Sequence, residues 1–325
     1  MSSPTLQALV FNLRHEARGI ISVELRPALE GERWPEVEAG AHIDLHLGNG
    51  MVRSYSLTNP GECHRYVVAV LNDPRSRGGS RYVHEQLRVG QVITIGAPRN
   101  HFRLDEAAPQ SVLLAGGIGI TPLLAMCRRL VALGRPAQLI YCARSRREAA
   151  FLQAIEAERE RSGGALRVSL RFDDEHGGPP DLQALLAGRP ADTHFYSCGP
   201  GPMLDAFERA CEALGQTHVH LERFAAAPTA EAPAPAAGAY TVELRQSGKT
   251  FAVPAGVSLL DAMLEAGGDP AFSCREGVCG ACETRVIEGE VDHHDHILTK
   301  SERAANKSMM ICVSHCRSAR LVLDA

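Results

Sequence analysis

The 325-residue sequence predicts a multi-domain protein with an antiparallel β-barrel, an α/β domain built on a parallel sheet, and a small cysteine-rich α+β domain. Three observations lead to this prediction. The chain is longer than one hydrophobic core usually serves. Its apolar pattern changes near residue 107 from short strands to alternating strands and helices. A segment rich in alanine and proline then separates residues 239–325, which hold five of the ten cysteines.

Residues 1–106 are predicted to form the barrel. They contain the short apolar segments IISVEL, AHIDLHL, MVRSYSLT, RYVVAVL and QVITIG, separated by turn residues. Many short strands without a long helical stripe are typical of a closed antiparallel sheet.

Residues 107–226 are predicted to form a nucleotide-binding domain. The segments SVLLAG and AQLIYCAR have the composition of buried strands, and TPLLAMCRRLVALG and REAAFLQAIEAERE that of the intervening helices. Strand, helix and strand in alternation indicate a parallel sheet. Residues 227–238 follow as a linker, because alanine and proline there give neither an apolar stripe nor strand alternation.

Composition excludes several classes of protein. A net charge of −4 leaves no basic excess for a nucleic-acid partner. No apolar run approaches the roughly 18 to 20 residues of a membrane span, and the N-terminus has charges where a signal peptide needs an apolar core. We therefore expect a cytoplasmic protein whose cysteines are thiols or metal ligands.

The cysteines of the last domain predict a metal cluster. Cys274, Cys279 and Cys282 are spaced C-x4-C-x2-C, and Cys312 follows in the apolar run MMICVS, which we expect to be a buried strand. This is the plant-type [2Fe–2S] spacing. Gly277 and Gly280 allow the tight backbone that would turn N–H groups toward a negatively charged cluster.

This region allows two other interpretations. A zinc site would pair Cys279 and Cys282 with Cys312 and Cys316, but would leave Cys274 over. We therefore expect Cys316 to be no ligand. The tract from Asp292 to His296, DHHDH, is expected to be a polar loop rather than a second metal site.

Two glycine-rich turns predict the nucleotide site. LLAGGIGITP runs from a strand through a turn into a helix, and YSCGPGPM repeats this pattern some eighty residues later. Free N–H groups and the helix dipole at such turns suit a pyrophosphate. The first turn departs from G-x-G-x-x-G because a proline stands where the third glycine would be.

A third pattern suggests a flavin site. Tyr55 in RSYS could lie against a flat ring whose edge hydrogen-bonds to Ser56, and Arg53 supplies a cation for a phosphate. The turn that begins at Gly78 offers N–H groups to the same phosphate. Taken singly, these are also common core and turn residues.

In their order along the chain, RSYSL, RGGS, AGGIGITP, YCAR, CGPGPM and the four-cysteine pattern resemble the phthalate dioxygenase reductase family. This family belongs to the ferredoxin–NADP reductase-like flavoproteins and includes vanillate demethylase reductases. The resemblance covers the whole chain. It implies FMN in the barrel, NADH as reductant, a β-grasp ferredoxin domain at the C-terminus, and a terminal Rieske non-haem iron oxygenase as partner.

The resemblance also assigns residues. Ser56 and Thr121 would orient the hydride transfer, with Cys198 near the nicotinamide. Flavin contacts would be Arg53, Ser54, Tyr55, Ser56, Val68, Ala69, Val70, Gly78, Gly79, Ser80, Thr121 and Phe224. Nicotinamide contacts would be Gly116, Gly117, Gly119, Arg144, Cys198, Gly199 and Pro200. Cys274, Cys279, Cys282 and Cys312 would ligate the cluster.

The expected function is electron transfer from NADH through FMN and the cluster to the oxygenase. A flavin is needed because NADH gives two electrons at once and the cluster accepts one. An alternative is a reductase that serves another one-electron acceptor protein. A more distant alternative is a binding module without flavin, whose tail holds zinc.

Overall fold

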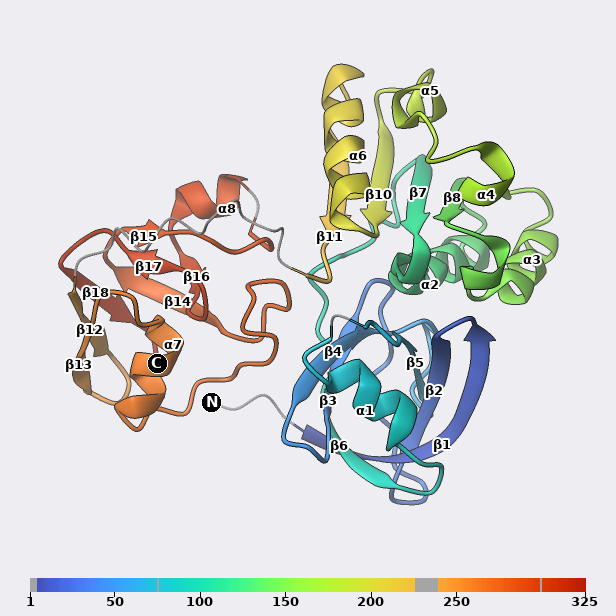
Figure 1. Cartoon of the computed structure of the whole chain (residues 1–325). Coiled ribbons are helices and arrows are strands. Elements are labelled where there is room, and N and C mark those ends of the chain that lie inside the picture. Colours follow the sequence, from blue (N-terminus) through green and yellow to red (C-terminus); the bar gives the residue numbers. More distant parts are fainter. Residues whose placement is uncertain (1–4, 75, 226–238, 299) are drawn as a thin grey trace. The chain divides into compact units, whose positions relative to one another are not determined.

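The computed structural model describes residues 5–74, 76–225, 239–298 and 300–325 (Figure 1). It divides into two compact units, Thr5–Glu222 and Arg223–Ala325, and each is described by itself. The predicted linker, residues 227–238, lies outside the described residues. Within the described part of the chain, no helix is long and apolar enough to cross a membrane.

The first unit begins with a barrel of six antiparallel strands in the order β4-β3-β6-β1-β2-β5 (Figure 1). Leu57 pairs with Val68, and the Thr58 N–H donates to the Val67 carbonyl oxygen at 2.9 Å, so the two edge strands meet and close the sheet. The elements are β1 (Thr5–Ala17), β2 (Ile20–Pro27), β3 (His42–His46), β4 (Val52–Ser56), β5 (Tyr66–Leu71), α1 (Gly79–Glu85) and β6 (Val92–Gly96).

The same unit continues into a five-stranded parallel sheet in the order β11-β10-β7-β8-β9. Its elements are β7 (Gln110–Gly116), η1 (Gly117–Gly119), α2 (Ile120–Ala132), β8 (Ala137–Ala143), η2 (Arg146–Glu148), α3 (Leu152–Arg161), β9 (Leu166–Phe172), α4 (Asp173–His176), α5 (Leu182–Leu186), β10 (Thr193–Cys198), α6 (Gly201–Ala213) and β11 (Val219–Glu222). One buried cluster joins Ile20 and Ala69 of the barrel to Ile120 and Leu123 of α2. The two domains therefore share part of their core.

The second unit is a small α+β domain. Its main sheet has the order β13-β12-β18-β14-β16, in which β12 and β18 are parallel and the other pairs antiparallel. The domain also contains a separate two-stranded antiparallel sheet, β15-β17. The elements are β12 (Tyr240–Leu244), β13 (Thr250–Val253), α7 (Leu259–Glu265), β14 (Glu283–Glu288), β15 (Val291–Asp292), α8 (Lys300–Ala305), β16 (Ser308–Met310), β17 (His315–Cys316) and β18 (Arg320–Leu323).

Of two local predictions in this domain, one differs from the structure and one is confirmed. The strand in MMICVS ends at Met310, so Cys312 lies in the turn that follows rather than in the strand. The tract DHHDH does form a loop after Asp292, but Asp295 within it is only 2% exposed. The tract is thus the polar loop that the sequence predicted, with one carboxylate buried inside it.

Candidate cofactor sites

One corner of the barrel brings the predicted phosphate-binding residues together. A Cβ atom at Gly79 would lie 2.7 Å from Cγ of Arg53 and 2.8 Å from its Nε, so the turn and the arginine are in contact. Gly78, with φ of 108°, starts α1 there, and Ser80 is buried just inside the helix. Free N–H groups beside a guanidinium fit the phosphate of FMN.

The residues predicted to contact the flavin lie in different surroundings within the barrel. The Ser54 hydroxyl donates to Oδ1 of Asp44 at 2.6 Å, so it is already engaged within the barrel. Val68 and Val70 belong to the barrel core, whereas Ala69 of the same strand faces the α2 side. Of these residues, only Ala69 has its side chain in the core that the barrel shares with the nucleotide domain.

The two predicted nucleotide-binding turns lie against each other. A Cβ atom at Gly119 would overlap the carbonyl oxygen of Cys198, and one at Gly116 would lie 2.8 Å from Cδ of Pro200. A Cβ at Gly199 would lie 3.0 Å from the Cα of Gly116. Only glycine permits these approaches, which bring the ends of β7 and β10 to one point. Open-sheet proteins bind their ligands at this carboxyl edge.

Glu222 joins this edge to the barrel. The Ser56 hydroxyl donates to its Oε2 at 3.5 Å, across 166 residues of sequence. Burial raises the pKa of Glu222 to about 8, and the hydrogen bond from Ser56 opposes this shift. Cys198 pairs with Glu222 across β10 and β11, and burial raises the pKa of its thiol far above its usual range. Thr121 is buried at the start of α2 and donates to the Ile118 carbonyl oxygen at 3.1 Å.

Sequence reasoning missed Glu222. It is the last residue of the last parallel strand, in the run HVHLERF, and a carboxylate at the carboxyl edge of a sheet is the signal that could have found it.

Arg144 follows β8, where its carbonyl oxygen accepts from the Asp174 N–H at 3.1 Å and its side chain is exposed. Phe224 is 41% exposed and falls in the second unit, so its predicted flavin contact stays a prediction.

Glu222 predicts a pH dependence. We expect the rate of flavin reduction by NADH, followed by flavin bleaching in stopped flow, to fall as pH rises through about 8. Below that value the carboxyl is protonated and neutral, and above it a negative charge lies next to Ser56 and disfavours delivery of a hydride there. The rate should drop about tenfold by about pH 9, where roughly one chain in ten keeps the proton.

E222Q is neutral at every pH and should show a level profile through this range. E212Q, which changes an exposed glutamate of α6, should keep the wild-type profile. A fall near pH 8 that persists in E222Q would assign it to another group.

In the second unit, the four predicted ligands meet as two pairs of sulfurs. The Cys282 thiol lies 3.1 Å from the Cys312 sulfur, and Cys274 is hydrogen-bonded to Cys279. The thiol that donates lowers the pKa of its partner: Cys279 lowers the pKa of Cys274 to about 6, and Cys282 lowers that of Cys312. Two paired sulfurs for each of two irons fit a [2Fe–2S] cluster.

Backbone N–H groups also point at these sulfurs. The Glu276 N–H donates to the Cys274 sulfur at 3.3 Å, and the Cys274 N–H donates to the Cys279 sulfur at 3.4 Å. Gly277, with φ of 67°, lies in the same loop and adopts a backbone conformation that favours glycine. Such a nest of donors stabilises the negative charge of a thiolate-bound cluster.

Cys316 lies apart from both pairs. It is buried on β17, where its sulfur lies 3.1 Å from the Ser318 hydroxyl and Val291 is its strand partner. In the part of the chain that the structure describes, no three Cys, His, Asp or Glu side chains converge on one ion. Sulfurs that pair two and two suit a binuclear cluster better than a single zinc ion.

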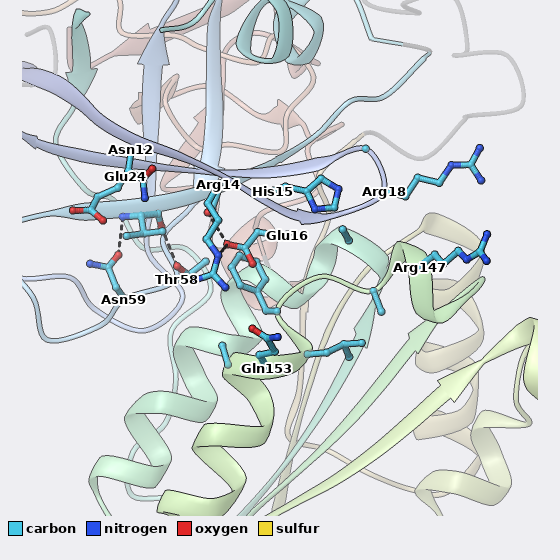
Figure 2. Close-up of a pocket in the computed structure, with 18 of the residues that line it drawn as sticks. Asn12, Arg14, His15, Glu16, Arg18, Glu24, Thr58, Asn59, Arg147 and Gln153 are labelled. Carbon is cyan, nitrogen blue, oxygen red and sulfur yellow. Dashed lines mark hydrogen bonds and ion pairs between the residues drawn. The ribbon is translucent and has the colours of Figure 1, made fainter. Parts of the chain in front are cut away.

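A cleft of about 1220 Å3 lies between the barrel and the nucleotide domain, and none of the predicted cofactor contacts lines it. Figure 2 shows Arg14, His15 and Arg18 on its barrel side, with Arg147 and Gln153 opposite. Arg128 reaches across it to the Thr58 carbonyl oxygen, and the Arg18 N–H donates to the Arg147 carbonyl oxygen at 2.8 Å. These contacts brace the two domains.

Comparisons with known proteins match both the nucleotide-binding domain and the cysteine-rich domain. The oxidoreductase NAD-binding domain family matches residues 113–209, and the 2Fe-2S iron-sulfur cluster binding domain family matches residues 242–317. Phenoxybenzoate dioxygenase subunit beta of Ectopseudomonas oleovorans is 49% identical over 314 residues, which cover 96% of this chain and 95% of that protein. Tetrachlorobenzoquinone reductase of Sphingobium chlorophenolicum is 46% identical over 329 residues, with 100% of both chains covered. The solved structure of phthalate dioxygenase reductase matches with a TM-score of 0.70 and 35% identity, covering 99% of this chain and 98% of that one.

Barrel, nucleotide-binding sheet and cluster domain together define an NADH-dependent iron–sulfur flavoprotein oxidoreductase that uses FMN. Its similarity to characterised reductases extends over the full length. The chain belongs to the phthalate dioxygenase reductase family. The predicted fold class, family and cofactors are thereby confirmed.

Proposed function

We propose that this chain is the reductase component of an oxygenase system and delivers single electrons to a terminal Rieske non-haem iron oxygenase. The observation that carries the proposal is that all three electron-carrier sites lie in one chain, which matches phenoxybenzoate dioxygenase subunit beta along nearly its whole length. The ten cysteines are all free, which suits the reducing cytoplasm in which we place it.

The chain's residues would act as follows. Arg53 and the Gly78–Ser80 turn would hold the FMN phosphate, and the paired turns at Gly116–Gly119 and Cys198–Pro200 would hold the nicotinamide. Bound FMN supplies the conversion from two-electron to one-electron chemistry. Ser56 and Thr121 would orient the reacting groups. The buried thiol of Cys198 stays protonated, so its role would be to pack against the nicotinamide rather than to act as a nucleophile.

The final transfer is energetically favourable. A plant-type cluster has a potential near about −400 mV and a Rieske centre one of about −150 mV or above. A difference of about 250 mV, at about 59 mV per tenfold for one electron, favours transfer to the oxygenase by roughly four powers of ten.

The test is cofactor content followed by reconstitution. Purified protein should release one FMN per chain and contain two irons and two sulfides, because one phosphate corner and two sulfur pairs are present. Mixed with NADH and a purified Rieske oxygenase encoded beside it, the protein should support substrate oxidation. Release of FAD, or zinc in place of iron, would contradict the cofactor assignment. Loaded protein that reduces no Rieske oxygenase would contradict the partner.

A second candidate is reduction of a quinone without a protein acceptor, which the similarity to tetrachlorobenzoquinone reductase favours. A quinone can take electrons directly from the flavin. If this is the function, a variant without the cluster should keep quinone reduction while it loses transfer to the oxygenase.

A further inference from the structure

The loop after β15 forms an ion pair with α8, and the carboxylate of this pair is fully buried. No predicted function uses it. Asp295 has a fully buried side chain, and its Oδ2 accepts from the N–H groups of Ile297 and Leu298 at 3.1 and 2.9 Å. Arg303 of α8 donates both to the carbonyl oxygen of Asp295 and, at 3.4 Å, to its Oδ2. One arginine thereby fixes the backbone and the side chain of the same residue.

This loop lies directly on the segment that carries the cluster ligands. The His296 N–H donates to the Gly277 carbonyl oxygen at 2.9 Å, and a Cβ atom at Gly277 would lie 3.1 Å from the Cα of Asp295. The His294 N–H also donates to the Ser314 hydroxyl at 3.2 Å, close to Cys312 in sequence. The loop is thus attached both to the ligand loop between Cys274 and Cys279 and to the chain just after Cys312.

Gly277 connects this loop to the cluster. Its carbonyl oxygen accepts from the His296 N–H, and the residue before it, Glu276, donates its N–H to the Cys274 sulfur at 3.3 Å. The hydrogen bond from His296 therefore holds the ligand loop one residue away from a donor to a ligand sulfur. Hydrogen bonds to the sulfurs are among the features that set the potential of an iron–sulfur cluster.

We propose that Asp295 and Arg303 are positioning residues for the [2Fe–2S] cluster: they hold the 294–298 loop against Gly277, so that the ligand loop keeps the Glu276 N–H on the Cys274 sulfur and the cluster potential stays high. A reduced cluster carries one more negative charge than an oxidised one. A donor held on a ligand sulfur therefore favours reduction. Loss of the brace, by which we mean the contacts between Asp295 and Arg303, lowers the potential. The proposal rests on the cluster assignment, and a chain that binds no iron would fail that assignment first.

The experiment separates position from charge by measuring the midpoint potential of the cluster in the full-length protein. R303M removes the brace and a positive charge, and both changes lower the potential. D295N alone removes a negative charge, which raises the potential, and also removes the carboxylate of the brace, which lowers it, so the single variant does not separate the two effects. D295N/R303M keeps the net charge of the native pair while it removes the brace.

We expect the double variant to reduce its cluster at least tenfold less favourably than the wild type, which is about 59 mV for one electron. Its EPR signal should also broaden as Gly277 takes several positions. R317M is the matched control, because it removes one positive charge from an exposed ion pair with Asp292 in the same domain. Its potential should match that of the wild type.

A double variant that returns to the wild-type potential would overturn the proposal, since charge alone would then explain R303M. Should R303M take up no cluster, R303K provides the test. Lysine keeps the charge but offers a single point of contact instead of a planar fork, so its potential should still fall. A wild-type potential and EPR signal in R303K would equally overturn the proposal.

Discussion

C312S should lose the [2Fe–2S] cluster, whereas C316S should keep it with nearly unchanged visible and EPR spectra. The two cysteines are four residues apart and both are buried, yet their surroundings differ. The Cys312 sulfur lies 3.1 Å from the Cys282 sulfur. Cys316 lies beside Ser318 and faces Val291 across a strand pair.

Serine has nearly the size of cysteine, but the pKa of its hydroxyl is far higher than that of a thiol. It therefore does not readily lose its proton to become an alkoxide ligand. C312S should therefore contain less iron, and reduction of one-electron protein acceptors should be lost with it. C316S exchanges one weak hydrogen-bonding group for a stronger one beside Ser318. Iron content, visible spectra and EPR of both variants provide the measurement. A cluster that is lost in C316S and kept in C312S would reverse the ligand assignment.

Much of the fold could be predicted because short segments of the sequence already indicate their secondary structure. Alternation in IISVEL and QVITIG and the strand–helix succession after Ser111 predict the two folds of the first unit, and both are confirmed. The four-cysteine spacing predicts the cluster from residues that lie close in sequence, apart from Cys312. Where a motif is short and carries its own glycines, sequence spacing already constrains the geometry.

What the sequence did not show depends on contacts between distant segments. Glu222 and Asp295 are charged residues in polar runs, and nothing near them in sequence indicates that they are enclosed. Glu222 is half-buried, and its carboxyl lies against Ser56, which is 166 residues away in sequence. Asp295 is buried because α8 brings Arg303 over it. Burial of a charge is a property of the folded chain, so local pattern alone could not identify either residue.

Separation of the two units at the alanine–proline segment should divide the function as well as the chain. Residues 1–226 contain the phosphate corner at Arg53 and Gly79, the paired turns at Gly119 and Cys198, and Glu222. The compact unit Thr5–Glu222 has its own core, so a cut after residue 226 should expose little buried surface. We expect this fragment to fold, keep FMN and reduce ferricyanide with NADH at a rate within about twofold of the full-length protein.

The fragment should fail to reduce cytochrome c, because a one-electron protein acceptor is served by the cluster that it lacks. Full-length C312S is the matched control: it keeps the second unit but should have no cluster, and it should show the same loss with cytochrome c and the same retention with ferricyanide. Agreement between the two proteins would attribute the loss to the missing cluster rather than to a missing docking surface. A C312S protein that still reduces cytochrome c while the fragment does not would assign the second unit a binding role. Undiminished cytochrome c reduction by the fragment would make the flavin the point of exit, and the cluster would then no longer be an obligatory relay.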